Sequence, residues 1–194
     1  MSFIKNTAFS LRVTNHEREA VNNITGRFQE DGKDAACSAG FLCVRAEQLP
    51  LAGYAGKLND NAWHMNAAAD GAAGPIFACN TFDVNTIVDE ITGAEYKVGT
   101  NTLGLPAPAG RDCTYTYIDF DSGIKQYRFG EGNLSGELGE NGFATIKDGL
   151  LVPTDAAPAT AGEAYFKVVG SGAWTQGAYN GFGYVDVIAM RAKG

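Results

Sequence analysis

Four cysteines are the residues of this chain best suited to chemistry, because a thiolate is both a nucleophile and a metal ligand. They are Cys37, Cys43, Cys79 and Cys113. No two of them have the Cys-x-x-Cys spacing that is typical of structural zinc sites. Each lies in an apolar or strand-like context, which favours buried, reduced thiols that pack as small hydrophobic side chains. Two disulfides, or a zinc site that uses all four thiols, are the alternatives that the sequence leaves open.

Other catalytic residue types are present without forming a known motif. His64 follows Trp63, but no Gly-x-Ser-x-Gly, His-Glu-x-x-His or cysteine-protease signature accompanies it. Asp119 and Asp121 flank a turn, where aspartates are commonly exposed. Paired carboxylates also serve glycosidases, and this spacing matches the start of a calcium loop without its later ligands. We therefore predict a protein that is not an enzyme and that uses no metal and no cofactor.

The C-terminal part of the chain interleaves glycines with aromatic residues between positions 174 and 184. The simplest interpretation is a Gly-rich hairpin whose rings face the core. Because aromatic rings are enriched at protein interfaces, Trp174, Tyr179 and Phe182 are also candidates for binding a partner. A platform on which sugars stack is the third interpretation.

Residues 1–34 differ from the rest of the chain in being rich in charge and poor in glycine. A capping-box spacing followed by a helical apolar periodicity predicts a short helix over 15–25, which Gly26 ends. The chain is therefore divided into an N-terminal arm, residues 1–34, and a β-rich body, residues 35–194. The arm carries apolar candidates for binding a partner surface, either the chain's own core or another subunit: Phe3, Ile4, Phe9, Leu11 and Val13.

Composition indicates short strands and tight turns rather than long helices. The 194 residues include 25 glycines and 11% aromatic residues, and only 19% are charged. Short apolar or alternating runs recur about every ten residues between turn signals, which is typical of a β-sandwich or β-barrel. We therefore expect a mainly β protein, a compact β-sandwich or β-barrel domain whose N-terminal arm carries the short helix. The predicted strand regions are 40–48, 75–82, 112–120, 124–129, 142–152, 163–169 and 184–191.

Some of these regions also predict how strands pair. Residues 112–120 and 124–129 are expected to form a hairpin, and 142–152 is expected to turn at 147–149. Residues 84–98 fit a helix or a hairpin, and the Thr-Gly turn within them favours the hairpin. Residues 58–73 predict a long loop or a short helix.

The net charge of the chain disfavours partners that are themselves negatively charged. The chain carries a charge of −7, which does not suit binding to nucleic acid or to an anionic membrane. No apolar run is long enough to span a membrane, and the first residues lack the basic-then-apolar order of a signal peptide. We therefore expect a cytoplasmically made protein with no nucleic-acid partner and no membrane partner.

Several Gly- and Pro-rich phrases resemble segments of the head-decoration, or cement, proteins of tailed bacteriophages. The resemblance covers about residues 35–190 and leaves residues 1–34 and the cysteines outside its pattern. It implies a small β-rich protein that binds the outside of a capsid and stabilises it, and it carries over no catalytic residue. The phrases are YKVGTNTLGLPAPAG at 96–110, FGEGN at 129–133, GFAT at 142–145, KDGLLVP at 147–153, YFKV at 165–168 and QGAYNGFGY at 176–184.

Together these features predict a non-enzymatic structural protein of the virion, a capsid decoration protein on the outer capsid surface. Its expected partners are the major capsid protein and further copies of itself, in a homo-oligomer for which a threefold position favours a trimer. The alternative is a carbohydrate-binding β-module, associated with a virion or a cell surface, that uses the C-terminal aromatic residues.

Overall fold

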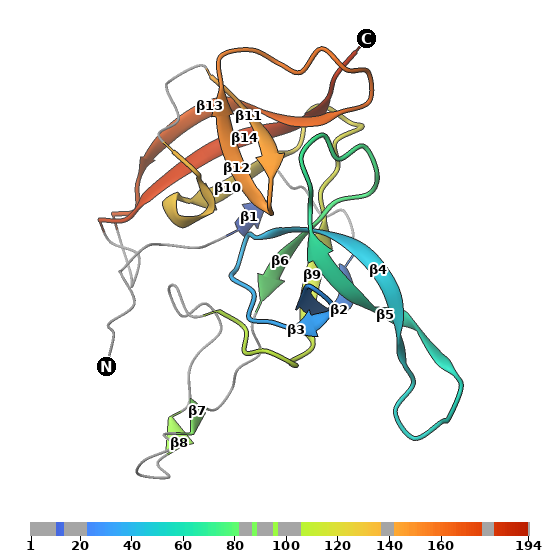
Figure 1. The fold of residues 1–194 in the computed structure, drawn as a ribbon. Helices are drawn as coiled ribbons and strands as arrows, with labels where there is room; N and C mark the ends of the chain where they lie inside the picture. The colour runs from blue at the N-terminus through green and yellow to red at the C-terminus, as the bar shows by residue number, and fades with distance from the viewer. Residues whose placement is uncertain are drawn as a thin grey trace.

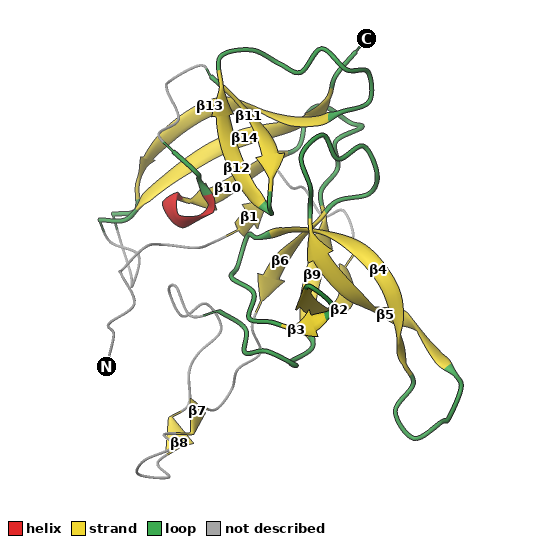
Figure 2. Cartoon of the chain, in the orientation of Figure 1, coloured by secondary structure: helices red, strands yellow, loops and turns green. Residues whose placement is uncertain are grey.

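The computed structural model describes residues 11–13, 23–81, 87–88, 95–96, 106–136, 142–175 and 181–193. In this part of the chain the regular structure is β, with strands β1 to β14 and the short 3-10 turn η1 (Glu131–Asn133) (Figure 2). Two six-stranded sheets hold every strand except β7 (Ile87–Val88) and β8 (Glu95–Tyr96), which pair with each other. The prediction of a mainly β fold of the sandwich or barrel type is confirmed.

One sheet, here called the open sheet, is antiparallel, with the strand order β1-β10-β14-β13-β11-β12 (Figure 1). Its inner face holds Phe166, whose ring packs against those of Phe120 and Phe129 at centroid distances of 5.1 and 5.6 Å. Each such buried ring contributes roughly 2–3 kcal/mol through removal of apolar surface from water. The strands are β1 (Leu11–Val13), β10 (Gln126–Gly130), β11 (Phe143–Lys147), β12 (Leu150–Thr154), β13 (Ala164–Ala173) and β14 (Gly183–Arg191).

The other sheet closes on itself into a ring of five strands, here called the closed barrel. β2 pairs in parallel with β5 on one side and antiparallel with β9 on the other, while β4 and β6 complete the ring between them. Closure leaves this ring without free edges, except where the short β3 extends β2. The strands are β2 (Asn23–Glu30), β3 (Lys33–Asp34), β4 (Leu42–Pro50), β5 (Leu58–Ala67), β6 (Phe77–Thr81) and β9 (Cys113–Tyr117).

The barrel interior is narrow, and Gly26 shows how narrow. A Cβ atom at this position would collide with the Met65 side chain and would lie 2.7 Å from Cδ2 of Tyr115. Only a residue without a side chain therefore leaves room for the Met65 and Tyr115 side chains, which come from the two strands paired with β2. At one mouth of the barrel Arg45 stacks its guanidinium over the rings of Trp63 and Phe77, at 4.9 and 5.4 Å from their centroids.

Residues 37–43, here called the junction segment, connect the closed barrel to the open sheet. The Ala39 carbonyl accepts a 2.8 Å hydrogen bond from Nδ2 of Asn133, a fully buried residue of η1. The Leu42 N–H donates to the Gly149 carbonyl at 2.8 Å, in the turn between β11 and β12. The Phe41 ring lies edge-on to Phe28 of the barrel, 5.4 Å between centroids. This segment therefore contacts both layers.

The apolar outer face of the barrel is covered by the open sheet. Leu42, Ala78 and Ile118 belong to the same buried cluster as Phe166 and Val187 of the open sheet. A second, separate cluster fills the barrel interior. The molecule thus has two cores, one between the layers and one inside the ring.

Most predicted strands are confirmed. The regions 40–48, 75–82, 163–169 and 184–191 contain β4, β6, β13 and β14. The 142–152 region is the β11–β12 hairpin, with Asp148 and Gly149 at its turn in the left-handed conformation. Within 84–98, the hairpin is confirmed by the pairing of Ile87–Val88 with Glu95–Tyr96.

Three predictions are wrong for residues that the structure describes. Residues 23–25, the end of the predicted helix, begin β2, because their pairing with β5 and β9 outweighs helical periodicity; residues 14–22 lie outside the described ranges. The 58–73 region contains β5 rather than a loop or helix. The 112–120 and 124–129 regions are both strands, but β9 joins the barrel and β10 the open sheet, so they do not form a hairpin.

The predicted boundary at residue 34, between the N-terminal arm and the β-rich body, falls within one sheet of the structure. β2 and β3, which fall within the 1–34 arm, are built into the same sheet as β4, β5, β6 and β9 of the body. Phe28 of β2 is part of the core inside the barrel.

We expect Gly149→Ala to destabilise the fold by about 2–4 kcal/mol. Gly149 has a φ of +76°, and a Cβ there would collide with the Phe41 ring, so backbone strain of about 1 kcal/mol adds to an overpacking cost of about 1–3 kcal/mol. The matched control is Gly162→Ala, because Gly162 has a φ of +80° with nothing within 4 Å. Urea unfolding of both variants separates strain from collision, and equal losses would contradict the role given to Phe41.

Candidate functional site

The four cysteine thiols converge in and around the barrel interior. Cys43, Cys79 and Cys113 come from β4, β6 and β9, while Cys37 belongs to the junction segment, which lies across one end of the ring. All four are buried and none forms a disulfide. The prediction of buried, free thiols is therefore confirmed, but their convergence on one place was not predicted.

Strand register explains why three of the thiols share one face. Cys79 stands opposite Tyr115, and Cys113 is two positions before Tyr115 on β9. Cys43 stands opposite Phe77, two positions before Cys79. Because side chains two apart on a strand point to the same side, these three thiols line the interior in a diagonal row centred on Cys79.

Cys37 approaches this row from outside the ring. Its backbone exchanges two hydrogen bonds with Ala107, at 3.1 and 2.6 Å, which fixes it over the barrel end. Hydrogen bonding from Cys43, and then from Cys79, holds the pKa of the Cys37 thiol well below its usual value, while burial opposes this shift. Burial and Cys37 itself raise the pKa of Cys43 well above its usual value. Of this pair, Cys37 is therefore the thiol that gives up its proton more readily.

Tyr115 completes the thiol cluster. The residue is fully buried and lies beside Cys37, yet its hydroxyl has no partner at hydrogen-bond distance among the residues that the structure describes. Burial, and then the neighbouring thiols, raise the pKa of this phenol far above its usual value, so it stays protonated. Among the described residues, no group of three or more His, Cys, Asp or Glu side chains is placed to hold a metal ion.

The carboxylates singled out in the sequence occupy a loop after β9. Oδ1 of Asp119 accepts hydrogen bonds from the N–H groups of Asp121 and Ser122 at 3.1 and 3.0 Å, and Oδ2 lies 3.4 Å from Nζ of Lys125. Partial burial favours a higher pKa for Asp119, but these N–H donors and the ammonium outweigh it and hold the pKa below its usual value. The carboxylate of Asp119 thus organises a turn.

His64 lies on β5, opposite Arg27 of β2. Its Nδ1 is buried without a hydrogen-bond partner among the described residues. The nucleophiles considered with it in the sequence, Cys79 and Cys113, belong to the thiol cluster, whose core members do not include His64.

The C-terminal aromatic residues form a packed group on the open sheet. The Trp174 ring lies edge-on to Tyr184, 4.9 Å between centroids, and Arg128 stacks over Tyr184 at 3.7 Å. Arg128 is held in turn by two 2.7 Å hydrogen bonds to Asp186 on the next strand. The two rings therefore pack on each other instead of lying flat side by side, which favours the packed-hairpin interpretation over a sugar platform.

The other predicted partner-binding residues are distributed differently. The Phe182 carbonyl accepts a 3.0 Å hydrogen bond from the Trp174 N–H at the end of β13 and β14, whereas Tyr179 lies outside the described residues. Leu11 and Val13 lie in β1, which pairs with β10 of the same chain. Phe3, Ile4 and Phe9 also lie outside the described residues.

The most prominent surface feature is the β4–β5 hairpin, which extends away from both layers (Figure 1). Its loop is ordered by hydrogen bonds from the Leu51 N–H to the Lys57 carbonyl and from the Tyr54 N–H to the Leu51 carbonyl, at 2.8 and 3.1 Å. At this end Tyr54 is 60% exposed and Leu58 is 56% exposed. Residues 49–58 include one lysine and no acidic residue, although the whole chain carries a charge of −7. Sequence analysis missed this tip, because it assigned 58–73 to a loop or helix.

We expect Asp119→Asn to lower the free energy of unfolding by about 0.5–1 kcal/mol at pH 7, the range of a surface ion pair. Asn keeps an oxygen for the turn and loses the charge that faces Lys125. Because the folded pKa is depressed, this stabilisation is present above about pH 4 and is lost as the pH falls through the folded value. Thermal unfolding from pH 7 to pH 2.5 measures the difference between wild type and variant.

The matched control is Asp121→Asn. The Asp121 side chain is 73% exposed and lies 3.4 Å from Arg191, so we expect a change near zero. A difference between wild type and Asp119→Asn that persists unchanged at pH 2.5 would contradict the assignment.

Comparisons with known proteins were made at three levels. The chain matches no protein-family model, no curated protein and no solved structure. In the described part of the chain, no helix is long and apolar enough to cross a membrane. What these residues do is therefore inferred from their own chemistry and placement.

Proposed function

We propose that this chain is a non-enzymatic decoration protein of a tailed-bacteriophage head, and that the β4–β5 hairpin makes its main contact with the major capsid protein. The observation that carries the proposal is the exposed apolar tip of that hairpin, with Tyr54 and Leu58. Apolar side chains presented together on a projecting element are typical of a protein-binding surface. Tyrosine is among the residue types that supply most of the binding energy of an interface, and Leu58 adds apolar surface that a partner can bury.

The charge of the tip supports the same contact. An acidic chain repels other acidic surfaces, and the tip, with Lys57 and no carboxylate between 49 and 58, is free of that repulsion. The ammonium of Lys57 stays close to the Tyr54 ring, 5.6 Å from its centroid. The tip can therefore bury its apolar groups on a neighbouring protein without burying an acid.

The sequence phrases that resemble decoration proteins give independent support for a structural role on a phage head. Those at 129–133, 142–153 and 165–168 lie in β10, η1, β11, β12 and β13, all at the open sheet. Four of the six phrases thus lie in one structural layer, whereas most of the phrase at 96–110 and of the phrase at 176–184 lies outside the described residues. The proposal places the protein on the outer capsid surface, where a repeated lattice multiplies modest contacts. It also includes self-association, with a trimer favoured.

We expect the wild-type chain to co-sediment with undecorated capsids and Tyr54→Ser/Leu58→Ser to bind at least about tenfold more weakly. Loss of two buried anchors removes roughly 1.5–3 kcal/mol each, and about 1.4 kcal/mol corresponds to tenfold in Kd. Sedimentation against increasing protein concentration measures Kd, and sedimentation velocity of the free protein measures its oligomeric state.

The matched control is Ile124→Ser, which removes an apolar side chain that is 68% exposed but far from the hairpin in sequence and on a different loop. We expect this variant to bind as the wild type does. A folded wild-type protein that does not bind capsids would overturn the proposed function. Binding that survives the double substitution would overturn the role of the hairpin.

A further inference from the structure

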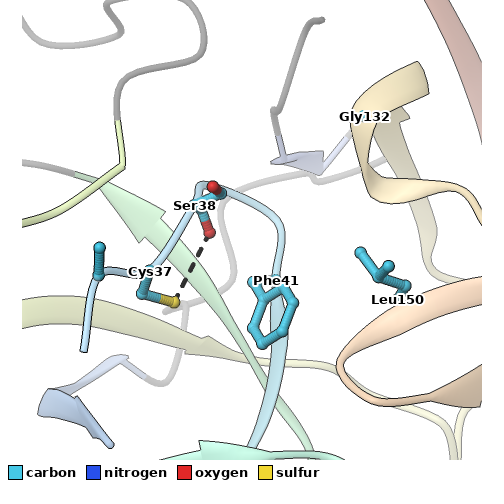
Figure 3. Close-up of a pocket in the computed structure, with 6 residues that line it drawn as sticks. Cys37, Ser38, Phe41, Gly132 and Leu150 are labelled. Atoms are coloured by element: carbon cyan, nitrogen blue, oxygen red, sulfur yellow. Dashed lines mark hydrogen bonds between the residues drawn. The ribbon is translucent and has the colours of Figure 1, made fainter. Parts of the chain in front are cut away.

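The thiol cluster has an entrance at Cys37. A cavity of about 270 Å³ lies where the junction segment meets the open sheet, lined by Ala36, Cys37, Ser38, Phe41, Gly132 and Leu150 (Figure 3). Its volume is several times the roughly 30 Å³ that a water molecule occupies, so a small peroxide fits inside. Cys43, Cys79 and Cys113 do not line this cavity. Of the four thiols, Cys37 is therefore the one that an oxidant inside this cavity meets first, whereas Cys113, which is 8% exposed against 2% for Cys37, does not line the cavity.

Local chain geometry selects Cys43 as the partner of Cys37. The Phe41 N–H donates to the Ser38 carbonyl at 3.2 Å, so the chain turns back between the two cysteines. Cys43 is also the first of the side chains that lower the pKa of Cys37, ahead of Cys79, as expected for a thiol close to it. By contrast, diagonal positions on paired strands are roughly 7–8 Å apart, beyond the roughly 4.4–6.8 Å that a disulfide spans between Cα atoms. The in-sheet pairs Cys43–Cys79 and Cys79–Cys113 are therefore unsuited to a disulfide.

The surroundings also favour reaction at this place. Cys37 lies in the junction segment and not on a barrel strand, so a movement of its sulfur onto Cys43 strains its two backbone hydrogen bonds with Ala107 and not the pairing of a barrel strand. The unpartnered hydroxyl of Tyr115 beside it can donate a hydrogen bond to an oxygen atom placed on the Cys37 sulfur. The lowered pKa of Cys37 favours formation of the thiolate, the form of cysteine that attacks peroxides.

We propose that Cys37 and Cys43 form a peroxide-oxidised dithiol whose disulfide fixes the junction between the two layers. In the first step the Cys37 thiolate attacks hydrogen peroxide, the O–O bond breaks, an S–O bond forms, and the departing hydroxide leaves as water after protonation. In the second step the Cys43 sulfur attacks the sulfenic acid, the S–O bond breaks, and a second water leaves. Two thiols lose two electrons and two protons, and hydrogen peroxide is reduced to two waters.

Oxidation changes the segment that holds the two layers together. Residues 37–43 include the Ala39 carbonyl that binds Asn133 and the Leu42 N–H that binds Gly149. A disulfide across this segment restricts its freedom in the unfolded chain, so we expect Tm to rise by about 5 °C. A reducing agent such as dithiothreitol is expected to reverse the shift.

The test is to treat the folded full-length chain with hydrogen peroxide, alkylate the remaining thiols, and map tryptic peptides by mass spectrometry. Cleavage after Lys33 and Arg45 leaves Cys37 and Cys43 on one peptide, residues 34–45, with Cys79 and Cys113 on two others. We expect peptide 34–45 to lose two hydrogen atoms and to escape alkylation. A cross-link from 34–45 to another peptide, or first oxidation at Cys79 or Cys113, would overturn the proposal.

Two variants make the pairing specific. In Cys43→Ser we expect the sulfenic acid of Cys37 to persist and to be trapped by dimedone, a reagent selective for sulfenic acids, with no rise in Tm. Cys113→Ser is the matched control, because it removes a buried thiol of the same cluster and leaves the pair intact, so oxidation of peptide 34–45 is expected to continue. Continued loss of two hydrogens from 34–45 in Cys43→Ser, or no trapped sulfenic acid there, would contradict the mechanism.

Discussion

The contact of Phe41 with Gly149 is the constraint on which the arrangement of the two layers depends. Gly149 gives the β11–β12 turn its left-handed conformation and leaves the space that the Phe41 ring fills. Its N–H and carbonyl then bind Ala68 and Leu42 of the barrel side at 3.0 and 2.8 Å. One turn of the open sheet is thus hydrogen-bonded to two places on the barrel side, and the buried Asn133 amide fixes the junction segment from the other direction. These bonds position the apolar surfaces that form the core between the layers.

The narrow interior of the closed barrel explains why cysteines occupy its inward-facing positions. A ring of five strands leaves little room, as the approach of Met65 and Tyr115 to Gly26 shows, so positions facing inward favour small apolar side chains beside a few large ones. Cysteine meets this requirement on β4, β6 and β9. Because three thiols face the barrel interior and Cys37 lies beside them, the thiols shift one another's pKa values. Side chains that fill the interior thus also form a reactive group.

The sequence was sufficient for the β class, for most strands and for the β11–β12 hairpin, because alternation and turn residues are local signals. It was insufficient wherever pairing joined distant segments. β9 and β10 are close in sequence and both carry clear alternation, yet they belong to different sheets, because Cys79 opposite Tyr115 and Gln126 opposite Ile188 are long-range pairs. The burial of each cysteine followed from its apolar neighbours, whereas their convergence depended on the long-range pairing of β6 with β4 and with β9. The exposed tip at Tyr54 was missed because β5 is rich in polar residues and gives no strand signal.

Strand β4 connects the two features that carry the functional proposals. It begins at Leu42, inside the junction segment, and ends at Pro50, beside the tip that displays Tyr54. A strand of this length spans roughly 30 Å, so a rotation of about 5° at its start moves its end by roughly 2.5 Å, which is comparable to the tolerance of a packed interface. The tip can therefore hold a defined position only if the start of β4 is held firmly. The hydrogen bonds around Ala39 and Leu42 supply that restraint in the reduced chain, and a bond between Cys37 and Cys43 would add a covalent restraint at the same place.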